Sequence, residues 1–273
     1  MLCMSATPIP RSLSLTLFGD LDLSVIDEMP PNRQFVKTYA VDDNMRARVY
    51  NFVKKELDVG RQAYIVCPLV DPTDKIEARA VNDFIKLLLE EELRGYTAAA
   101  IHGRSKDKDR IMTDFSAGKI QVLISTTVVE VGVNVPNATV MIIENTERFG
   151  LSQLHQLRGR VGRGSHQSYC IMFNQSAGEL AGKRMDIMTK TNDGFVIAKT
   201  DMELRGAGEF FGTRQHGLPE LKIANIFTDE PVLKTASSAA YETLKNDAGL
   251  LRDEHKPLRE QVRKFFSGEI IFN

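Results

Sequence analysis

The 273-residue sequence has no apolar run that approaches the roughly 20 residues needed to cross a bilayer, and its first residues do not form a basic flank followed by an apolar stretch. A membrane-spanning protein is therefore not expected, and the sequence predicts a cytoplasmic one. Charge is nearly balanced, with 35 Lys and Arg against 36 Asp and Glu. Because no overall field of one sign exists, any binding to a polyanion must depend on local patches.

Cysteine is scarce as well. The three cysteines, Cys3, Cys67 and Cys170, lie far apart in the sequence, each within an apolar stretch. This pattern favours buried free thiols over a disulfide framework, and we expect no metal site. The chain needs neither for stability, because at about 150 residues per domain it is long enough for two domains with sizeable cores.

Six apolar runs of strand length alternate with amphipathic stretches between about residues 34 and 174. Nearly continuous apolar runs of this length are typical of parallel strands that are buried on both faces. The sequence therefore predicts an α/β domain in which helices flank a parallel sheet. The predicted strands are residues 34–41, 62–70, 97–101, 121–125, 139–144 and 168–173.

Helix start and stop signals lie between these runs, as capping side chains and as glycines that end amphipathic stretches. The predicted helices are one capped by Asp42 or Asp43 that ends near Gly60, one over residues 76–94 stopped by Gly95, and one from Ser105 to Gly118.

The two flanks of this unit have different patterns. Residues 1–30 do not fit inside it, and we interpret them as the tail of a preceding domain, so the sequence is expected to be a fragment. After residue 175 the strand-like runs stop and helical patterns dominate. The predicted division is residues 1–30, 31–175 and 176–273, with helices over 177–190, 200–205, 231–246 and 258–266.

The segment 153–164, QLHQLRGRVGRG, carries the strongest chemical signal. Arg158, Arg160 and Arg163 are separated by glycines and follow a predicted helix that Ser152 could cap. Glycine permits close backbone approach, and guanidinium groups match phosphate oxygens, so this group suits a triphosphate supplied from outside the domain. The alternative is a solvated basic helix end, although such ends usually mix Glu and Lys.

Residues 156–163, QLRGRVGR, resemble motif VI of superfamily-two helicases. The resemblance implies a RecA-like fold for the sheet domain, with Arg160 and Arg163 as arginine fingers on the γ-phosphate of ATP and Gln156 as a third catalytic residue.

Three further segments resemble helicase motifs in the same order. Taken alone, each has a simpler reading, such as a turn before Pro8 or a histidine at the edge of the core. Asn134 departs from the aspartate of many relatives, which puts in doubt a charged contact to the ribose. The implied residues are Ser5, Ala6 and Thr7 of motif III, His102, Gly103 and Arg104 as a phosphate contact, Thr126 and Thr127 of motif V as a contact to the nucleic-acid backbone, and Gly132 and Asn134 on the ATP side.

The longer segment 149–173 resembles the RecG-type bacterial helicases, which remodel stalled forks and other branched DNA, and the transcription-repair coupling translocases. Both have a helical hairpin and loop that couple ATP turnover to translocation on duplex DNA. Glycines 206, 208, 212 and 217 suggest a mobile loop here, and a surface loop with incidental arginines is the alternative. The implied DNA-binding and coupling residues are Arg184, Arg205, Arg214 and Gln215. The tail, residues 218–263, fits the RecG type better.

One essential part of a helicase motor is missing, because no Gly-x-x-x-x-Gly-Lys-[Ser/Thr] occurs in the sequence. The resemblance therefore implies that ATP and Mg²⁺ are bound mainly by a first motor domain that this chain lacks. That domain, a wedge domain and branched double-stranded DNA are the implied partners. We interpret residues 253–255, DEH, as a solvated charge run rather than a Mg²⁺-binding box. A stand-alone nucleic-acid-binding module with a motor-like fold remains the alternative.

Overall fold

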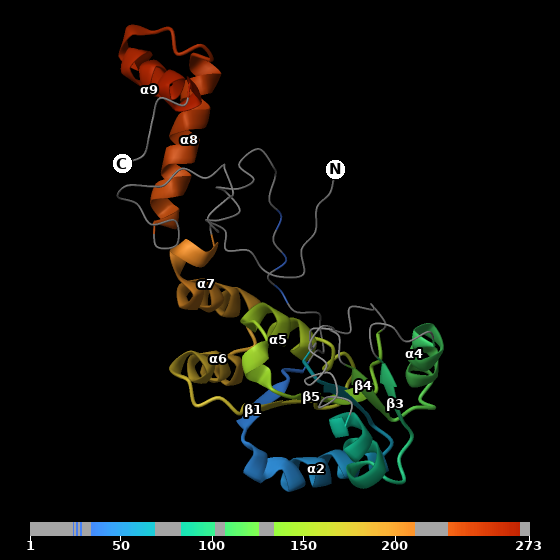
Figure 1. Cartoon of the computed structure of the whole chain (residues 1–273). Coiled ribbons are helices and arrows are strands. Elements are labelled where there is room, and N and C mark those ends of the chain that lie inside the picture. Colours follow the sequence, from blue (N-terminus) through green and yellow to red (C-terminus); the bar gives the residue numbers. More distant parts are fainter. Residues whose placement is uncertain are drawn as a thin grey trace. The chain divides into compact units, whose positions relative to one another are not determined.

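The computed structural model describes residues 34–68, 83–101, 107–125, 134–210 and 229–267, together with positions 24, 26 and 28. Six strands form one sheet in the order β1-β6-β5-β2-β4-β3, and all neighbours are parallel (Figure 1). The strands are β1 (Lys37–Val41), β2 (Gln62–Val66), β3 (Ala98–Ile101), β4 (Val122–Ser125), β5 (Ala138–Ile143) and β6 (Tyr169–Phe173). Every predicted strand is found, and the predicted α/β class is confirmed.

The helices lie largely where the sequence predicted them. Residues 83–87 are also helical and run into a π turn, Leu88–Glu92, whereas 76–82 and Ser105 lie outside the described residues. Asp42 accepts a hydrogen bond from the N–H of Asn44 and so caps the short turn Asp43–Met45 that leads into α2. The helices are α2 (Arg46–Asp58), α4 (Lys108–Ser116), α5 (Leu151–Arg158), α6 (Glu179–Lys190), α7 (Gly194–Phe210), α8 (Glu230–Asn246) and α9 (Lys256–Ser267).

Helices cover both faces of the sheet, because alternate side chains of each strand point to opposite sides. On one face, Tyr64 and Met141 join a core cluster with residues of α4, α5, α6 and α7. On the other, Ile65 and Ile142 pack against α2 and the helical segment 83–92. Figure 1 shows α5, α6 and α7 together on the side of the sheet opposite α2.

A buried ion pair fixes α2 to the end of β5. The Arg46 guanidinium donates to both carboxylate oxygens of Glu144 at 2.8 and 2.9 Å, and the Tyr50 hydroxyl donates to Glu144 at 3.2 Å. The Glu144 side chain is only 4% exposed. This pairing compensates a charge that would otherwise be costly to bury.

The C-terminal part differs from the sequence prediction at one point. Gly206 and Gly208 were expected in a mobile loop, but the backbone is helical as far as Phe210. A single glycine costs a helix only about 1 kcal/mol, and the buried first turns of α7, with Ile197 and Asp201, can stabilise the helix against that cost. The compact unit that contains the sheet continues through Ala207, so it includes α6 and most of α7.

The second compact unit contains α8 and α9. Residues 253–255 form a short 3-10 turn between them, and His255 Nδ1 lies 2.8 Å from the Asp247 carboxylate. The backbone N–H groups of Arg252 and Leu251 also donate to Asp247. None of the described helices is long and apolar enough to cross a membrane.

Candidate functional site

The helix α5 does not begin at the predicted cap. Its first residue follows Gly150, whose N–H donates to the side chain of Gln153 at 3.0 Å. Ser152, predicted as the cap, is already inside the helix, and its hydroxyl donates to Asp201 of α7 at 3.1 Å. The prediction is wrong because the hydroxyl has a partner 49 residues away that the local pattern does not reveal.

The loop 159–164 after α5 depends on glycine at two positions. Gly162 has φ of 75°, and a Cβ there would lie 2.8 Å from Cγ2 of Val36. A Cβ on Gly164 would lie 2.5 Å from the carbonyl oxygen of Pro136. The loop is therefore packed against two other segments, and only glycine allows this approach.

Arg160 and Arg163, the predicted fingers, both act on the same buried residue of the central strand β2. Burial raises the pKa of Tyr64 to about 12, and the positive charges of Arg163 and Arg160 oppose that shift. Arg163 also donates from Nε to the carbonyl of Gly159 at 3.0 Å. Within the described part of the chain, the Arg160 guanidinium has no hydrogen-bond partner, so its donors are available to an anion. The structure thus places the two predicted finger arginines in and beside a glycine-containing loop that follows α5.

Two other predicted residues lie near this loop in the fold. Asn134 is exposed and begins the segment that ends at Pro136, against which Gly164 packs. Gln156 is half-buried in the last turns of α5, and its side chain has no hydrogen-bond partner among the described residues. The structure thus brings the end of the motif V segment to the motif VI loop.

The remaining predicted residues are largely beyond what the structure describes. Arg184 is half-buried on α6, and its Nε is buried without a hydrogen-bond partner in the described part. Arg205 belongs to α7, of which only the backbone is described at that position. Outside the described residues are Ser5, Ala6, Thr7, His102, Gly103, Arg104, Thr126, Thr127, Gly132, Arg214 and Gln215.

Arg158 does not share the environment of the other two arginines. It is 2% exposed, and Nη1 donates to the carbonyl oxygens of Met188 and Thr191, each at 2.8 Å. Burial lowers the pKa of Arg158. The sequence did contain a signal for this burial, because Arg158 follows Leu154 by four residues and Leu151 by seven, which places it on the apolar face of α5.

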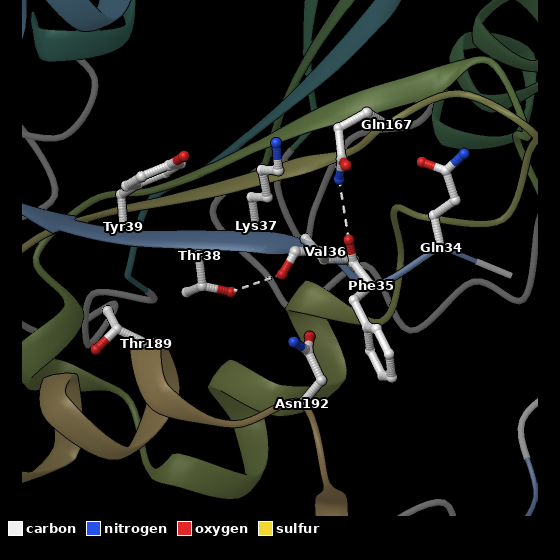
Figure 2. A pocket seen from close by; sticks show the side chains of 9 residues that line it. All are labelled: Gln34, Phe35, Val36, Lys37, Thr38, Tyr39, Gln167, Thr189 and Asn192. Atoms are coloured by element: carbon white, nitrogen blue, oxygen red, sulfur yellow. Dashed lines mark hydrogen bonds between the residues drawn. The ribbon is translucent and has the colours of Figure 1, made fainter.

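An open pocket of about 570 Å³ lies along the edge strand β1, and no sequence pattern indicated it (Figure 2). In Figure 2, Thr38 points from the strand into the pocket, between Thr189 at the end of α6 and Asn192, and its hydroxyl donates to the carbonyl of Val36 at 3.3 Å. Its lining residues are Gln34, Phe35, Val36, Lys37, Thr38, Tyr39, Gln167, Thr189 and Asn192. No group of three or more His, Cys, Asp or Glu suited to a metal ion occurs within the described ranges.

The parallel sheet and the glycine-arginine loop after α5 define a domain of the helicase C-terminal type. In agreement, residues 46–165 match the family model of the helicase conserved C-terminal domain. Residues 191–270 match a second model, ATP-dependent DNA helicase RecG, domain 3, C-terminal. The chain belongs to the RecG family, which confirms the family resemblance inferred from its motifs.

Similar proteins cover nearly the whole chain. It is 49% identical over 265 residues to the ATP-dependent DNA helicase RecG of Bacillus subtilis. The aligned part covers 96% of this chain and 39% of that protein. The RecG of Thermotoga maritima is 47% identical over 88% of this chain and 31% of its own length. A solved structure of RecG bound to a three-way DNA junction superposes with a TM-score of 0.66 at 46% identity, covering 85% of this chain and 30% of that one. The chain thus spans about two fifths or less of these relatives.

Proposed function

We propose that this chain is the C-terminal motor and coupling part of an ATP-dependent translocase that remodels branched double-stranded DNA, such as stalled forks and Holliday junctions, in recombination and repair. The observation that carries the proposal is the similarity, at 46% identity and a TM-score of 0.66, to RecG bound to a three-way DNA junction. The match of residues 191–270 to a RecG domain favours this over a transcription-repair coupling translocase. The site of action would be the bacterial cytoplasm, at the nucleoid.

The nucleotide would be held mainly by a preceding motor domain, together with Mg²⁺. When bound, ATP supplies the phosphoanhydride bond whose cleavage drives the motor. Arg160 and Arg163 would reach the γ-phosphate across the cleft, where such fingers contribute roughly 10³ to 10⁵ in rate. Gln156, Gly132 and Asn134 would complete this side of the site.

The DNA side would be formed by phosphate contacts. His102, Gly103 and Arg104 would contact the tracked backbone with Thr126 and Thr127, while the hairpin and loop would push the duplex. Because phosphate contacts carry little sequence information, recognition would depend on the structure of the branch rather than on its sequence. Ser5, Ala6 and Thr7 would link the nucleotide state to this grip.

The finger assignment is tested by Arg163→Ala in a protein with the length of the relatives. We expect kcat for ATP to fall at least about 10²-fold while the Kd for forked DNA changes little. Arg110→Ala is a matched control, because this exposed arginine on α4 contacts Asp114 on the same helix. Wild-type hydrolysis by the Arg163 variant would remove that residue from the ATP site.

The assignment of ATP binding mainly to the preceding motor domain is tested with the 273-residue chain itself. Because it lacks the phosphate-binding loop, it should release no phosphate from ATP, with or without forked DNA. Turnover that persists through repurification would contradict the proposal.

In the longer protein, Arg205→Ala or Gln215→Ala should retain fork-stimulated hydrolysis but lose unwinding, whereas a purely structural role would lower both activities and the Tm together.

A further inference from the structure

Arg158 connects the motif VI helix to the turn of the α6–α7 hairpin. Its two short hydrogen bonds end on the carbonyls of Met188, in the last turn of α6, and Thr191, directly after α6. Its Nη2 lies 3.1 Å from Nδ1 of His155, and Nη1 lies 3.5 Å from the hydroxyl of Thr38. None of these partners is a carboxylate, so no ion pair holds the guanidinium among the residues that the structure describes.

The choice of partners has a physical reason. The last carbonyls of a helix lack partners within the helix and carry the negative end of its dipole. A buried guanidinium at that position satisfies two of them and is itself compensated by the dipole. The turn is short, because Asp193 already accepts hydrogen bonds from the N–H groups that begin α7. Arg158 therefore holds the last turn of α6 together with the first residue of the turn that leads to α7.

A second hydrogen bond joins the other end of α5 to the same hairpin. Ser152, in the first turn of α5, donates to Asp201 of α7, whose side chain is buried. Arg158 lies six positions after Ser152 in the helix, which places the two attachment points about 9 Å apart along the axis. Two separated attachments fix the orientation of α5 relative to the hairpin, which one alone would leave free to rotate.

We propose that Arg158 is a positioning residue, a hydrogen-bonded joint that makes the motif VI helix and the α6–α7 hairpin move as one body. Arg160 and Arg163 come two and five residues after Arg158. When nucleotide displaces the loop 159–164, which we call the finger loop, the displacement therefore reaches the hairpin through this joint. The inference rests on the proposed function, and it separates Arg158 from the two arginines that face the nucleotide. Thr38, whose hydroxyl lies 3.5 Å from Nη1 of Arg158, also lines the pocket along β1 that Figure 2 shows.

The test measures base pairs unwound per ATP consumed on a forked duplex, using the longer protein. Arg158→Gln should lower this ratio at least about fivefold, with DNA-independent hydrolysis within about twofold of wild type. Arg158→Lys should restore at least half of the ratio, because an ammonium can donate to both carbonyls. Lys190→Ala is the control, since it removes an exposed cation from the same end of α6 without contact to α5.

A second variant, Ser152→Ala, tests the same joint in case Arg158→Gln destabilises the fold. Ser152→Ala removes the other attachment and should also lower the ratio, and the double variant with Arg158→Lys should lower it further. If Arg158→Gln has a wild-type Tm and an unchanged ratio of base pairs unwound per ATP consumed, the proposed role of Arg158 is refuted. A loss of hydrolysis like that of Arg163→Ala also refutes it. If Arg158→Gln lowers the Tm, an unchanged ratio in Ser152→Ala overturns it. A wild-type protein that neither hydrolyses ATP nor unwinds forks would instead refute the proposed function.

Discussion

Replacing Gly164 by alanine tests whether the finger loop depends on its packing. A Cβ at this position would lie 2.5 Å from the carbonyl oxygen of Pro136, and the obstacle is backbone, which cannot swing aside as a side chain can. Restoring an ordinary contact of 3.4 Å separates the two segments by about 0.9 Å. The shift falls directly beside Arg163, so the guanidinium moves with it.

The expected magnitude follows from that displacement. A misplacement of about 1 Å at a catalytic group can cost about 10² in rate. Gly164→Ala should therefore reduce kcat for ATP by about 30- to 100-fold, with little change in the Kd for forked DNA. Overpacking of this kind also costs about 1–3 kcal/mol of stability.

The assay is steady-state ATP hydrolysis by the longer protein on forked DNA, with thermal unfolding recorded for each variant. Gly182→Ala is the matched control, because a Cβ there meets nothing within 4 Å and alanine favours the helix α6. It should keep kcat within about twofold. A Gly164 variant with wild-type kcat and wild-type Tm would refute the reasoning that close packing places the fingers.

Three further predictions concern stability and reactivity. Arg46→Met should lower the free energy of unfolding by about 3 kcal/mol in urea titrations, because it leaves the Glu144 carboxylate buried without its ion pair; an unchanged urea midpoint would contradict this. Burial raises the pKa of Cys67 and of Cys170 to about 12, so both thiols should resist alkylation at pH 8. The free energy of unfolding should decline above about pH 9, where the thiols ionise only in the unfolded chain. Rapid alkylation of the native protein would contradict this burial. Hydrogen bonds from the backbone N–H groups of Arg252 and Leu251, and then from His255, lower the pKa of Asp247 to about 2. The stability that the Asp247 carboxylate contributes should therefore be present above pH 4 and lost between pH 4 and 2. An NMR titration midpoint of Asp247 near 4 would contradict this prediction.

The sheet could be predicted from sequence because its signals are local. Each strand is a short apolar run, and in a parallel sheet buried on both faces such runs need no partner to be recognised. Asp42 and the stop residue Gly118 act on backbone groups within a few residues of themselves. The buried thiols Cys67 and Cys170 were predicted from their apolar neighbours, and Cys3 lies outside the described residues.

The predictions that failed, or could not be made, depend on residues distant in sequence. Ser152 was assigned to a cap, but its partner is Asp201. Arg158 looks like Arg160 in a pattern of alternating glycines and arginines. Its spacing from Leu151 and Leu154 indicates that it is buried, but its hydrogen-bond partners at the end of α6, thirty residues further on, cannot be read from the local pattern. Gly206 was assigned to a loop on composition, yet helix formation in α7 is decided by the packing of the turns before it.

The strand order explains why the finger loop and the hairpin lie together. The strands β5 and β6 are neighbours in the sheet, α5 follows β5, and α6 follows β6. Both helices return over the same face, so Leu154 and Leu157 of α5 join Met185 and Met188 of α6 in one core cluster. Apolar packing of this kind resists separation but is nearly indifferent to rotation about the helix axis, because it has little directional preference. Hydrogen bonds at the two ends of α5 supply the direction that the apolar contact lacks. A rotation of α5 that moves the fingers must then either turn the hairpin with it or break buried hydrogen bonds, and leaving those carbonyls unsatisfied is the more costly outcome.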